Sequence, residues 1–149
     1  MTKFALKIKK IENLDLNSFV SFLREMKKEN PNFYKEGENV FARKVIKMNH
    51  SDKGIFLIAK EKDKVIGFCN LFGKNGRAEI GIGVHPNYRN KGIGKQLLDK
   101  ILKKAKEKGL RKVYAGVKKT NINSLNFFKK NGFIVNKVRE DSILLERII

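Results

Sequence analysis

The sequence has few of the residues that build disulfide frameworks or metal centres. Its 149 residues include one cysteine, Cys69, two histidines and no tryptophan. One cysteine excludes an internal disulfide, and three soft side chains are too few for a zinc finger, so we expect no metal site. No apolar run is long enough to span a membrane, and the first residues show no signal-peptide pattern. These absences predict a cytoplasmic protein that does not enter a membrane.

The length and composition are those of a folded chain. Hydrophobic residues make up 41% of the sequence and charged residues 33%, which is too apolar for a disordered protein. No internal repeat, low-complexity tract or linker interrupts it. We therefore expect one domain over residues 1–149.

Acidic residues are scarce relative to basic ones. The chain has 34 Lys and Arg against 15 Asp and Glu, a net charge of +19. Such a charge favours anionic partners, such as nucleic acid, an acidic membrane or a phosphorylated small molecule. A lysine bias spread over solvated surfaces explains the same number, and both interpretations stay open.

The hydrophobic pattern predicts eleven elements in the order βααβββαβαββ. Period-2 runs indicate strands and apolar residues at helical spacing indicate helices. The expected ranges are 4–8, 16–26, 39–48, 54–59, 65–72, 77–84, 92–108, 113–117, 124–131, 133–138 and 143–146. Antiparallel strands come first and a β-α-β unit comes after them, which predicts an α/β protein with a mixed, mostly antiparallel sheet and helices on both faces.

Three local features make this pattern testable. Asp15 precedes the first helix and is a candidate N-cap. The apolar stripe of the second helix is expected to consist of Val40, Phe41, Val45 and Met48. The polar segment 60–64 is expected to link the strands 54–59 and 65–72 as a hairpin.

The segment 84–95 joins a strand to a helix through a loop with glycines at alternate positions. Gly92 and Gly94 leave room for several backbone N–H groups to converge, and the helix N-terminus adds partial positive charge. The basic side chains nearby are Arg89, Lys91 and Lys95. This combination predicts a phosphate-binding loop.

Two common nucleotide motifs fit this loop poorly. A Walker loop needs a glycine where Arg89 stands and a serine or threonine where Gln96 stands. A dinucleotide fingerprint needs a third glycine where this chain has Leu97. The loop is therefore expected to bind some other phosphate group.

Two spaced motifs resemble those of the GNAT superfamily of N-acetyltransferases. Arg89-x-x-Gly92-x-Gly94 resembles the acetyl-CoA pyrophosphate motif of that family. A later segment, similar to the family's N-x-x-A-x-x-F-Y-x-K-x-G-F, consists of Asn121, Ser124, Phe127, Phe128, Lys130, Gly132 and Phe133. The resemblance implies the GNAT fold. It also implies transfer of acetyl from acetyl-CoA to a primary amine of a small molecule, peptide or protein, by direct attack in a ternary complex.

The resemblance also implies how acetyl-CoA would be held. The pyrophosphate would bind beside Arg89 to the backbone N–H groups of Asn90, Lys91, Gly92, Ile93, Gly94 and Lys95. The backbones of Ile82 and Val84 would pair with the pantetheine arm, and the Val84 N–H would stabilise the tetrahedral intermediate. Gly81 and Gly83 would let the pantetheine approach, or would only mark a bulge.

The second motif leaves three roles open. Asn121 either bonds the cofactor or starts a helix, and Lys130 either belongs to the cofactor site or caps a helix dipole. Phe128 stands where the family has the tyrosine that protonates the leaving thiolate, and phenylalanine cannot donate a proton. Tyr88, Tyr114 or water would have to replace it.

A base is needed for the attacking amine. The pKa of a lysine-like amine, about 10.4, lies about 3.4 units above pH 7. The pKa of an α-amine, near 8, lies only about one unit above it. Glu79 is the candidate base, through a water, and its alternative is a surface charge paired with Arg77. His85 is expected to be a loop residue, and His50 and Cys69 have no assigned role.

The acceptor groove is expected between the N-terminal helices and the last hairpin. Family analogy places four residues at its border, Phe33, Tyr34, Glu36 and Glu38. Exposed strand edges in the last hairpin suggest a homodimer. Two alternatives stay open: a catalytically weak acyl-CoA sensor, which Phe128 supports, and a basic module that binds nucleic acid or another polyanion, which the net charge supports.

Overall fold

The computed structural model describes residues 6–31, 33–49, 54–74 and 76–149, and within them the predicted element order is confirmed. The strands are β1 (Leu6–Lys10), β2 (Gly54–Glu61), β3 (Lys64–Lys74), β4 (Arg77–Val84), β5 (Lys112–Lys118), β6 (Ile134–Val138) and β7 (Ser142–Ile148). The helices are α1 (Leu16–Glu29), α2 (Glu38–Asn49), α3 (Ile93–Glu107) and α4 (Ile122–Lys130), with short 3-10 turns η1 (Asn13–Asp15) and η2 (Pro86–Tyr88). The start of the first expected strand, at 4–5, lies outside the described residues.

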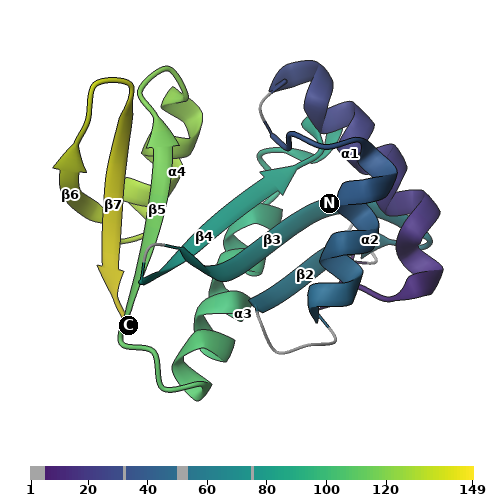
Figure 1. Ribbon diagram of the computed structural model, residues 1–149, viewed down its shortest axis with the longest axis horizontal. Coiled ribbons are helices and arrows are strands. Elements are labelled where there is room, and N and C mark those ends of the chain that lie inside the picture. The colour runs from purple at the N-terminus through teal and green to yellow at the C-terminus, as the bar shows by residue number, and fades with distance from the viewer. Residues whose placement is uncertain (1–5, 32, 50–53, 75) are drawn as a thin grey trace.

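The strands form one sheet in the order β1-β2-β3-β4-β5-β7-β6. Every neighbouring pair is antiparallel except β4 and β5, so the prediction of a mixed, mostly antiparallel sheet is confirmed. β4 and β5 lie close at their first residues and separate toward their ends (Figure 1). The sheet therefore has two halves, β1–β4 and β5–β7–β6.

Helices cover both faces of the sheet, as predicted, because β2 and β3 are apolar on both sides. Ile55 and Leu57 belong to the core that includes α3 and α4, whereas Phe56 and Ile58 belong to the core that includes α1 and α2. Burying both faces requires the near-continuous apolar runs seen in these two strands. None of the helices within the described ranges is long and apolar enough to cross a membrane.

Two local expectations were right only in part. Val45 is buried in α2, Phe41 and Met48 pack beside it, and β2 and β3 form the expected hairpin. Val40 is 60% exposed, and the buried residues of α2 are Ala42, Val45 and Ile46, because the face that packs on the sheet is rotated away from Val40. The segment 60–64 is not a five-residue link. β2 runs to Glu61 and β3 begins at Lys64, which leaves a two-residue turn.

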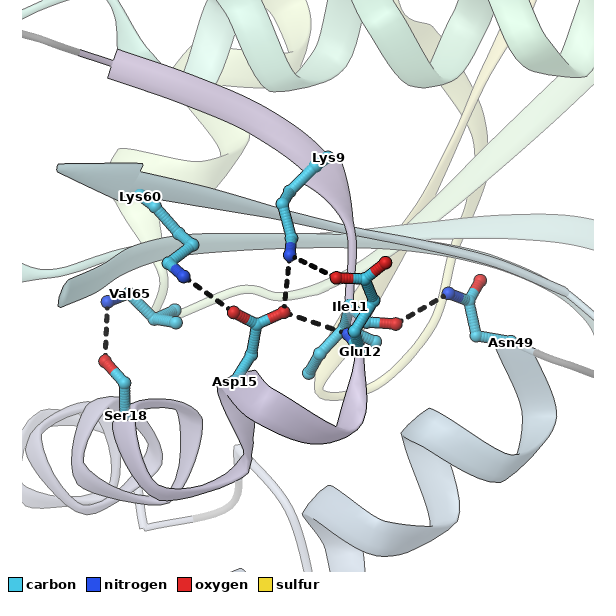
Figure 2. A network of polar contacts seen from close by, with 8 residues as sticks. All are labelled: Lys9, Ile11, Glu12, Asp15, Ser18, Asn49, Lys60 and Val65. Atoms are coloured by element: carbon cyan, nitrogen blue, oxygen red, sulfur yellow. Dashed lines mark hydrogen bonds and ion pairs between the residues drawn. The ribbon is translucent and has the colours of Figure 1, made fainter. Parts of the chain in front are cut away.

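Asp15 occupies the N-cap position of α1, as the sequence suggested, but its side chain does not cap the helix. Its side chain makes no capping bond to α1 and is fully buried. The carboxylate instead accepts from Lys60 Nζ at 2.7 Å and lies 2.9 Å from Lys9 Nζ (Figure 2). Burial alone would raise the pKa of Asp15, but the hydrogen bonds from Lys60 and Lys9 hold it below its ordinary value.

The same polar network fixes α1 and α2 on the sheet. Asp15 also accepts from the Glu12 backbone N–H at 2.9 Å. Ser18 Oγ accepts from the Val65 N–H at 2.8 Å, at the start of β3. Asn49, the last residue of α2, donates through Nδ2 to the Ile11 carbonyl at 3.2 Å. Figure 2 shows the start of α1 joined to the end of β2 and the start of β3, and α2 joined to the segment after β1.

We expect Asp15→Asn to destabilise the fold by about 3–5 kcal/mol, because it leaves Lys60 and Lys9 without their buried counter-charge. The free energy of unfolding in urea measures the effect. Asp99→Asn is the matched control, since Asp99 meets Lys95 at 2.9 Å in an exposed pair and its loss should cost little. Equal losses for the two variants would contradict the assignment.

The Asp15 contribution should also depend on pH in one direction. A carboxyl whose pKa is lower in the folded state stabilises the fold above its unfolded value of about 3.9 and loses that effect as the pH falls through the folded value. The stability difference between the native protein and Asp15→Asn should therefore be constant near neutral pH and shrink below about pH 4. A difference that grows on acidification would contradict this sign.

Candidate active site

A cavity of about 600 Å³ lies where β4 and β5 separate. One wall comes from the end of α1 and the segment after it, with Glu29 and Phe33, and from β3. The opposite wall comes from the end of β5 and the start of α4, with Val117 and Ser124. The cavity thus crosses the sheet between its two halves, and β4 forms its floor.

The floor of the cavity exposes backbone groups of β4. β4 and β5 share one registered pair, Glu79 with Tyr114. At the other edge of β4, the His85 N–H bonds to the Ile66 carbonyl at 2.8 Å, which sets the alternation of the β3–β4 ladder. The peptide groups of Ile82 and Val84 consequently face away from β3, toward the region that β5 has left. This is the edge at which the family resemblance places the pantetheine arm.

The loop after β4 has two residues in the left-handed region. Asn90 has φ +60° and Gly92 has φ +79°, and α3 begins at Ile93. Left-handed residues placed in this way turn successive N–H groups to one side, which makes an anion-binding concavity at a helix N-terminus. Gly92 supplied the sequence signal, whereas the conformation of Asn90 had none.

Gly94 has a packing role. A Cβ on Gly94 would lie 3.2 Å from Cε1 of Phe127, so the start of α3 packs directly against α4. This contact joins the two motifs that the sequence analysis identified. The glycine loop and the start of α4 therefore lie at the same end of the molecule as the cavity.

The basic side chains of the loop are largely engaged. Arg89 Nη1 lies 2.6 Å from Glu29 Oε1, and Arg89 Nε donates to the Val84 carbonyl at 3.1 Å. Lys95 pairs with Asp99 at 2.9 Å on the surface of α3. Arg89 thus connects the loop to the ends of α1 and β4, a connection that no sequence pattern indicated.

Glu79 lines the cavity, with 14% of its side chain exposed. Arg77 Nη2 lies 4.0 Å from Glu79 Oε2, so the ion pair considered as an alternative is present as well. Glu79 Oε1 lies over Gly116, 3.5 Å from where a Cβ there would be. The carboxylate is therefore placed both to receive an amine and to balance a neighbouring cation.

Gly81 and Gly83 make room for side chains of this chain. A Cβ on Gly81 would lie 2.7 Å from Asn70 Oδ1, which accepts from the Gly81 N–H at 3.0 Å. A Cβ on Gly83 would lie 2.9 Å from Cζ of Phe33. This packing accounts for both glycines within the chain, and their role toward the pantetheine stays a prediction.

Asn70 is a cavity residue that the sequence analysis missed. It is the only polar side chain in the otherwise apolar stretch 65–72 of β3, and that was the one signal in the sequence. Its register partner is Gly81, which explains why the amide can fold across onto β4. Asn70 therefore provides a fixed polar group in an otherwise largely aromatic part of the wall.

The start of α4 supplies three residues of the cavity wall, Asn121, Ser124 and Phe128. Asn121 Oδ1 accepts from the Ser124 N–H at 3.2 Å, so Asn121 is a helix N-cap as well as a wall residue. Phe128 packs edge-on against Phe133 with ring centres 5.0 Å apart. Lys130 lies exposed in the last turn of α4 and does not line the cavity, in keeping with the dipole alternative.

The two tyrosines considered as replacement acids do not line the cavity. Tyr88 donates to Glu61 Oε1 at 3.4 Å, beyond the end of β4. Arg77 and Lys112 both stack on Tyr114, at 5.5 and 5.8 Å from the ring centre. The described part of the cavity wall therefore brings no tyrosine hydroxyl to the site.

His85 and Cys69 do not line the cavity. His85 is a buried loop residue whose Nδ1 accepts from the Asn87 N–H at 3.1 Å, and burial lowers its pKa. Cys69 is fully buried in the core, where desolvation raises the pKa of its thiol. His50 lies outside the described residues.

One of the four residues expected at the border of the acceptor groove lines the cavity. Phe33 lines the cavity, but Tyr34 is buried, with its hydroxyl 3.3 Å from the Leu23 carbonyl. Glu36 lies 4.0 Å from Lys44, and neither Glu36 nor Glu38 lines the cavity. The opposite wall is β5 and α4, and the described residues of the last hairpin contribute nothing to it, because β7 and β6 lie farther along the sheet.

Known proteins resemble this chain in sequence. An acetyltransferase of Sodalis glossinidius is 32% identical over 101 residues, which cover 66% of this chain and 67% of that protein. The L-amino acid N-acyltransferase MnaT of Escherichia coli is 28% identical over 85 residues, 53% of this chain and 49% of that protein. The chain thus spans about two thirds of the first relative and about half of the second.

Solved structures agree over nearly the whole chain. The PaiA N-acetyltransferase of Thermoplasma acidophilum, solved in complex with coenzyme A, superposes with a TM-score of 0.83 at 25% identity, covering 97% of this chain and 99% of that one. A GNAT-family acetyltransferase of Streptococcus pneumoniae gives a TM-score of 0.80 at 22% identity, with the same coverage, and shows the shared fold. The model of the acetyltransferase (GNAT) family matches residues 16–133. The chain belongs to the GNAT acetyltransferase family.

Proposed function

We propose that this protein transfers an acetyl group from acetyl-CoA to a primary amine by direct attack in a ternary complex. One observation carries the proposal: a pair of left-handed residues, Asn90 and Gly92, opens α3 beside the strand edge that β5 leaves uncovered. A diphosphate and an extended amide-containing arm need these two features side by side. The similarity to an N-acetyltransferase solved with coenzyme A supports the same conclusion.

The residues of the glycine loop and of β4 fit acetyl-CoA as the acetyl donor. The N–H groups of residues 90–95 would hold the pyrophosphate, and the peptide groups of Ile82 and Val84 would pair with the pantetheine. Acetyl-CoA supplies, when bound, the thioester whose acyl carbon the amine attacks. The Val84 N–H would donate to the carbonyl oxygen as negative charge develops there. Arg89 would hold the end of β4 in place through the Val84 carbonyl and Glu29.

Glu79 is the proposed base, acting through water on the incoming ammonium group. Glu79 would take one proton of the ammonium group through water and pass it to solvent. The nitrogen–carbon bond would then form and the carbon–sulfur bond break, and the nitrogen would give up a second proton to solvent while the thiolate takes one up. Phe128 offers no proton in the wall next to α4, so solvent would protonate the thiolate. A thiol with a pKa of about 8.5 is a leaving group for which this is feasible.

A homodimer is part of the proposal. β6 forms one edge of the sheet, and all five of its residues are exposed, with Ile134 at 65% and Val138 at 60%. A second copy could pair along this edge and cover these side chains. The cavity lies on the far side of β5 from this edge, so dimer formation would leave it open.

Gly92→Glu should abolish acetyl-CoA binding, because the new side chain enters the proposed diphosphate site with a repelling charge. Isothermal calorimetry measures the Kd. Gly109→Glu is the matched control, since Gly109 has φ +87° against +79° for Gly92 and both lie in open space. The two variants carry the same backbone strain, so only Gly92→Glu should lose affinity. An unchanged Kd for Gly92→Glu would refute the loop assignment.

Phe128→Tyr should raise kcat by about tenfold or more, because it restores a proton donor in the cavity wall. Release of free thiol with a panel of primary amines measures the rate. Phe127→Tyr adds the same hydroxyl to a neighbouring residue of α4 that does not line the cavity, and it should leave kcat unchanged. Equal rates for the native protein and Phe128→Tyr would show that thiolate protonation does not limit turnover.

A further inference from the structure

The side-chain amide of Asn70 has a fixed orientation in the cavity wall. The Gly81 N–H is a donor, so the atom of Asn70 that faces it at 3.0 Å must be the carbonyl oxygen. From the position of a Cβ on Gly81, Oδ1 would be 2.7 Å away and Nδ2 4.0 Å away, so Nδ2 is turned away from β4. Among the described residues no group accepts a hydrogen bond from Nδ2. Asn70 therefore presents two donor hydrogens to the cavity.

Asn70 and Glu79 act as a pair across two strands. Asn70 is opposite Gly81 and Phe72 is opposite Glu79, so Asn70 and Glu79 are diagonal neighbours on one face of the sheet. Such neighbours have Cβ atoms roughly 7 Å apart or somewhat less. The Asn70 amide and the Glu79 carboxylate thus both line the cavity, close enough for one small ligand to contact both.

Lysines lie at the outer part of the same cavity. Lys74 ends β3 and Lys118 ends β5, and both are exposed residues that line it. Of the two carboxylates in the described wall, Glu29 is already engaged by Arg89 at 2.6 Å. Lys74 and Lys118 give this part of the wall positive charge, in keeping with the net charge of +19 of the whole chain. Acceptors with several ammonium groups are repelled here, and acceptors with an anionic oxygen are attracted.

We infer that the acceptor is an amine with a carbonyl or carboxylate oxygen on the adjacent carbon, which Asn70 Nδ2 recognises while Glu79 receives the ammonium group. The inference rests on the proposed function and names its substrate class. A free α-amino acid and the N-terminus of a peptide share this chemistry. An alkylamine or a diamine lacks the oxygen, and its binding would leave the Asn70 donors unpaired in the cavity.

The basicity of the amine agrees with this choice. About one tenth of the terminal α-amine of a peptide, with a pKa near 8, is neutral at pH 7, but only about 0.04% of a lysine-like amine is. This argument favours the peptide N-terminus within the proposed class. Among the described wall residues one carboxylate is left to act as a base, with a cation 4.0 Å away, and no tyrosine is present. An amine that loses its proton readily suits such a site better than a strongly basic one.

The test compares alaninamide with propargylamine, a primary amine of similarly low basicity that has no oxygen. Calorimetry on the protein saturated with coenzyme A measures binding, and thiol release from acetyl-CoA measures turnover. We expect alaninamide to bind at least about tenfold more tightly and to react with the lower KM. Equal affinity for the two amines, or tighter binding of propargylamine or 1,4-diaminobutane, would overturn the inference.

Asn70→Asp tests the residue itself. The aspartate keeps an oxygen for the Gly81 N–H but replaces the donor Nδ2 by a second acceptor. It should weaken alaninamide binding about tenfold or more and leave propargylamine binding unchanged or tighter. Asn126→Asp, on the exposed face of α4, adds the same charge away from the cavity and should change neither. Equal losses for both amines in Asn70→Asp would mean that Asn70 only supports β4, and would overturn its recognition role.

Two further ligands, compared with alaninamide, identify the source of the amine. Alanine, alaninamide and an Ala-Ala dipeptide share the recognised group and differ in the atoms attached to its carbonyl carbon. If the site binds a free α-carboxylate, Lys74→Glu should weaken the binding of alanine more than that of alaninamide. If the acceptor is a peptide, the dipeptide should bind most tightly of the three ligands. Preferential binding of alaninamide without thiol release would refute the proposed function and leave the recognition intact. Thiol release with propargylamine as fast as with alaninamide would refute the recognition by Asn70 and leave the proposed function intact.

Discussion

The divergence of β4 from β5 determines the arrangement of the site. The two strands share a single parallel pair, at Glu79 and Tyr114, and then separate. A strand edge near the middle of a sheet cannot remain without hydrogen-bond partners, because buried peptide groups are costly to leave unpaired. On the proposed function, the pantetheine arm, which has amide groups of its own, occupies the edge at Ile82 and Val84. The cavity and the start of α4 lie along this edge at Ile82, and the glycine loop follows the end of β4.

The wall opposite this edge depends on a group far from it. Asp15 is buried with Lys60 and Lys9 and sets the start of α1 against β1 and the β2–β3 turn. The other end of α1 carries Glu29, which holds Arg89 and through it the carbonyl of Val84. The segment after α1 brings Phe33 against Gly83. The position of one end of the helix on the sheet thus determines the shape of the cavity at the other end.

Periodicity predicted what depends on neighbours in sequence. The element order, the bounds of β4 and the helix ends at Gly109 and Gly132 follow from local pattern and from glycine conformation. Contacts between distant residues were missed, because alternation shows which residues share a face but not which strand or lysine they meet. Asp15 and Lys60 are 45 residues apart, and the Asn70 amide reaches Gly81 only because β3 and β4 pair in one register. The left-handed Asn90 was equally invisible, since nothing in its neighbourhood demands that conformation.

The departures of this chain from its family's second motif agree with one another on the proposed function. Phe128 stands where the family has a tyrosine, so α4 brings no general acid to the cavity. No tyrosine is among the described residues that line the cavity. A reaction with weak acid assistance is best served by an amine that is partly neutral at physiological pH, which is the kind of amine that a carbonyl on the adjacent carbon produces. The Asn70 amide, held by Gly81 and facing the cavity, is a donor for that carbonyl. The loss of one catalytic group and the presence of an unexpected polar group in β3 thus have a single physical explanation in the choice of acceptor.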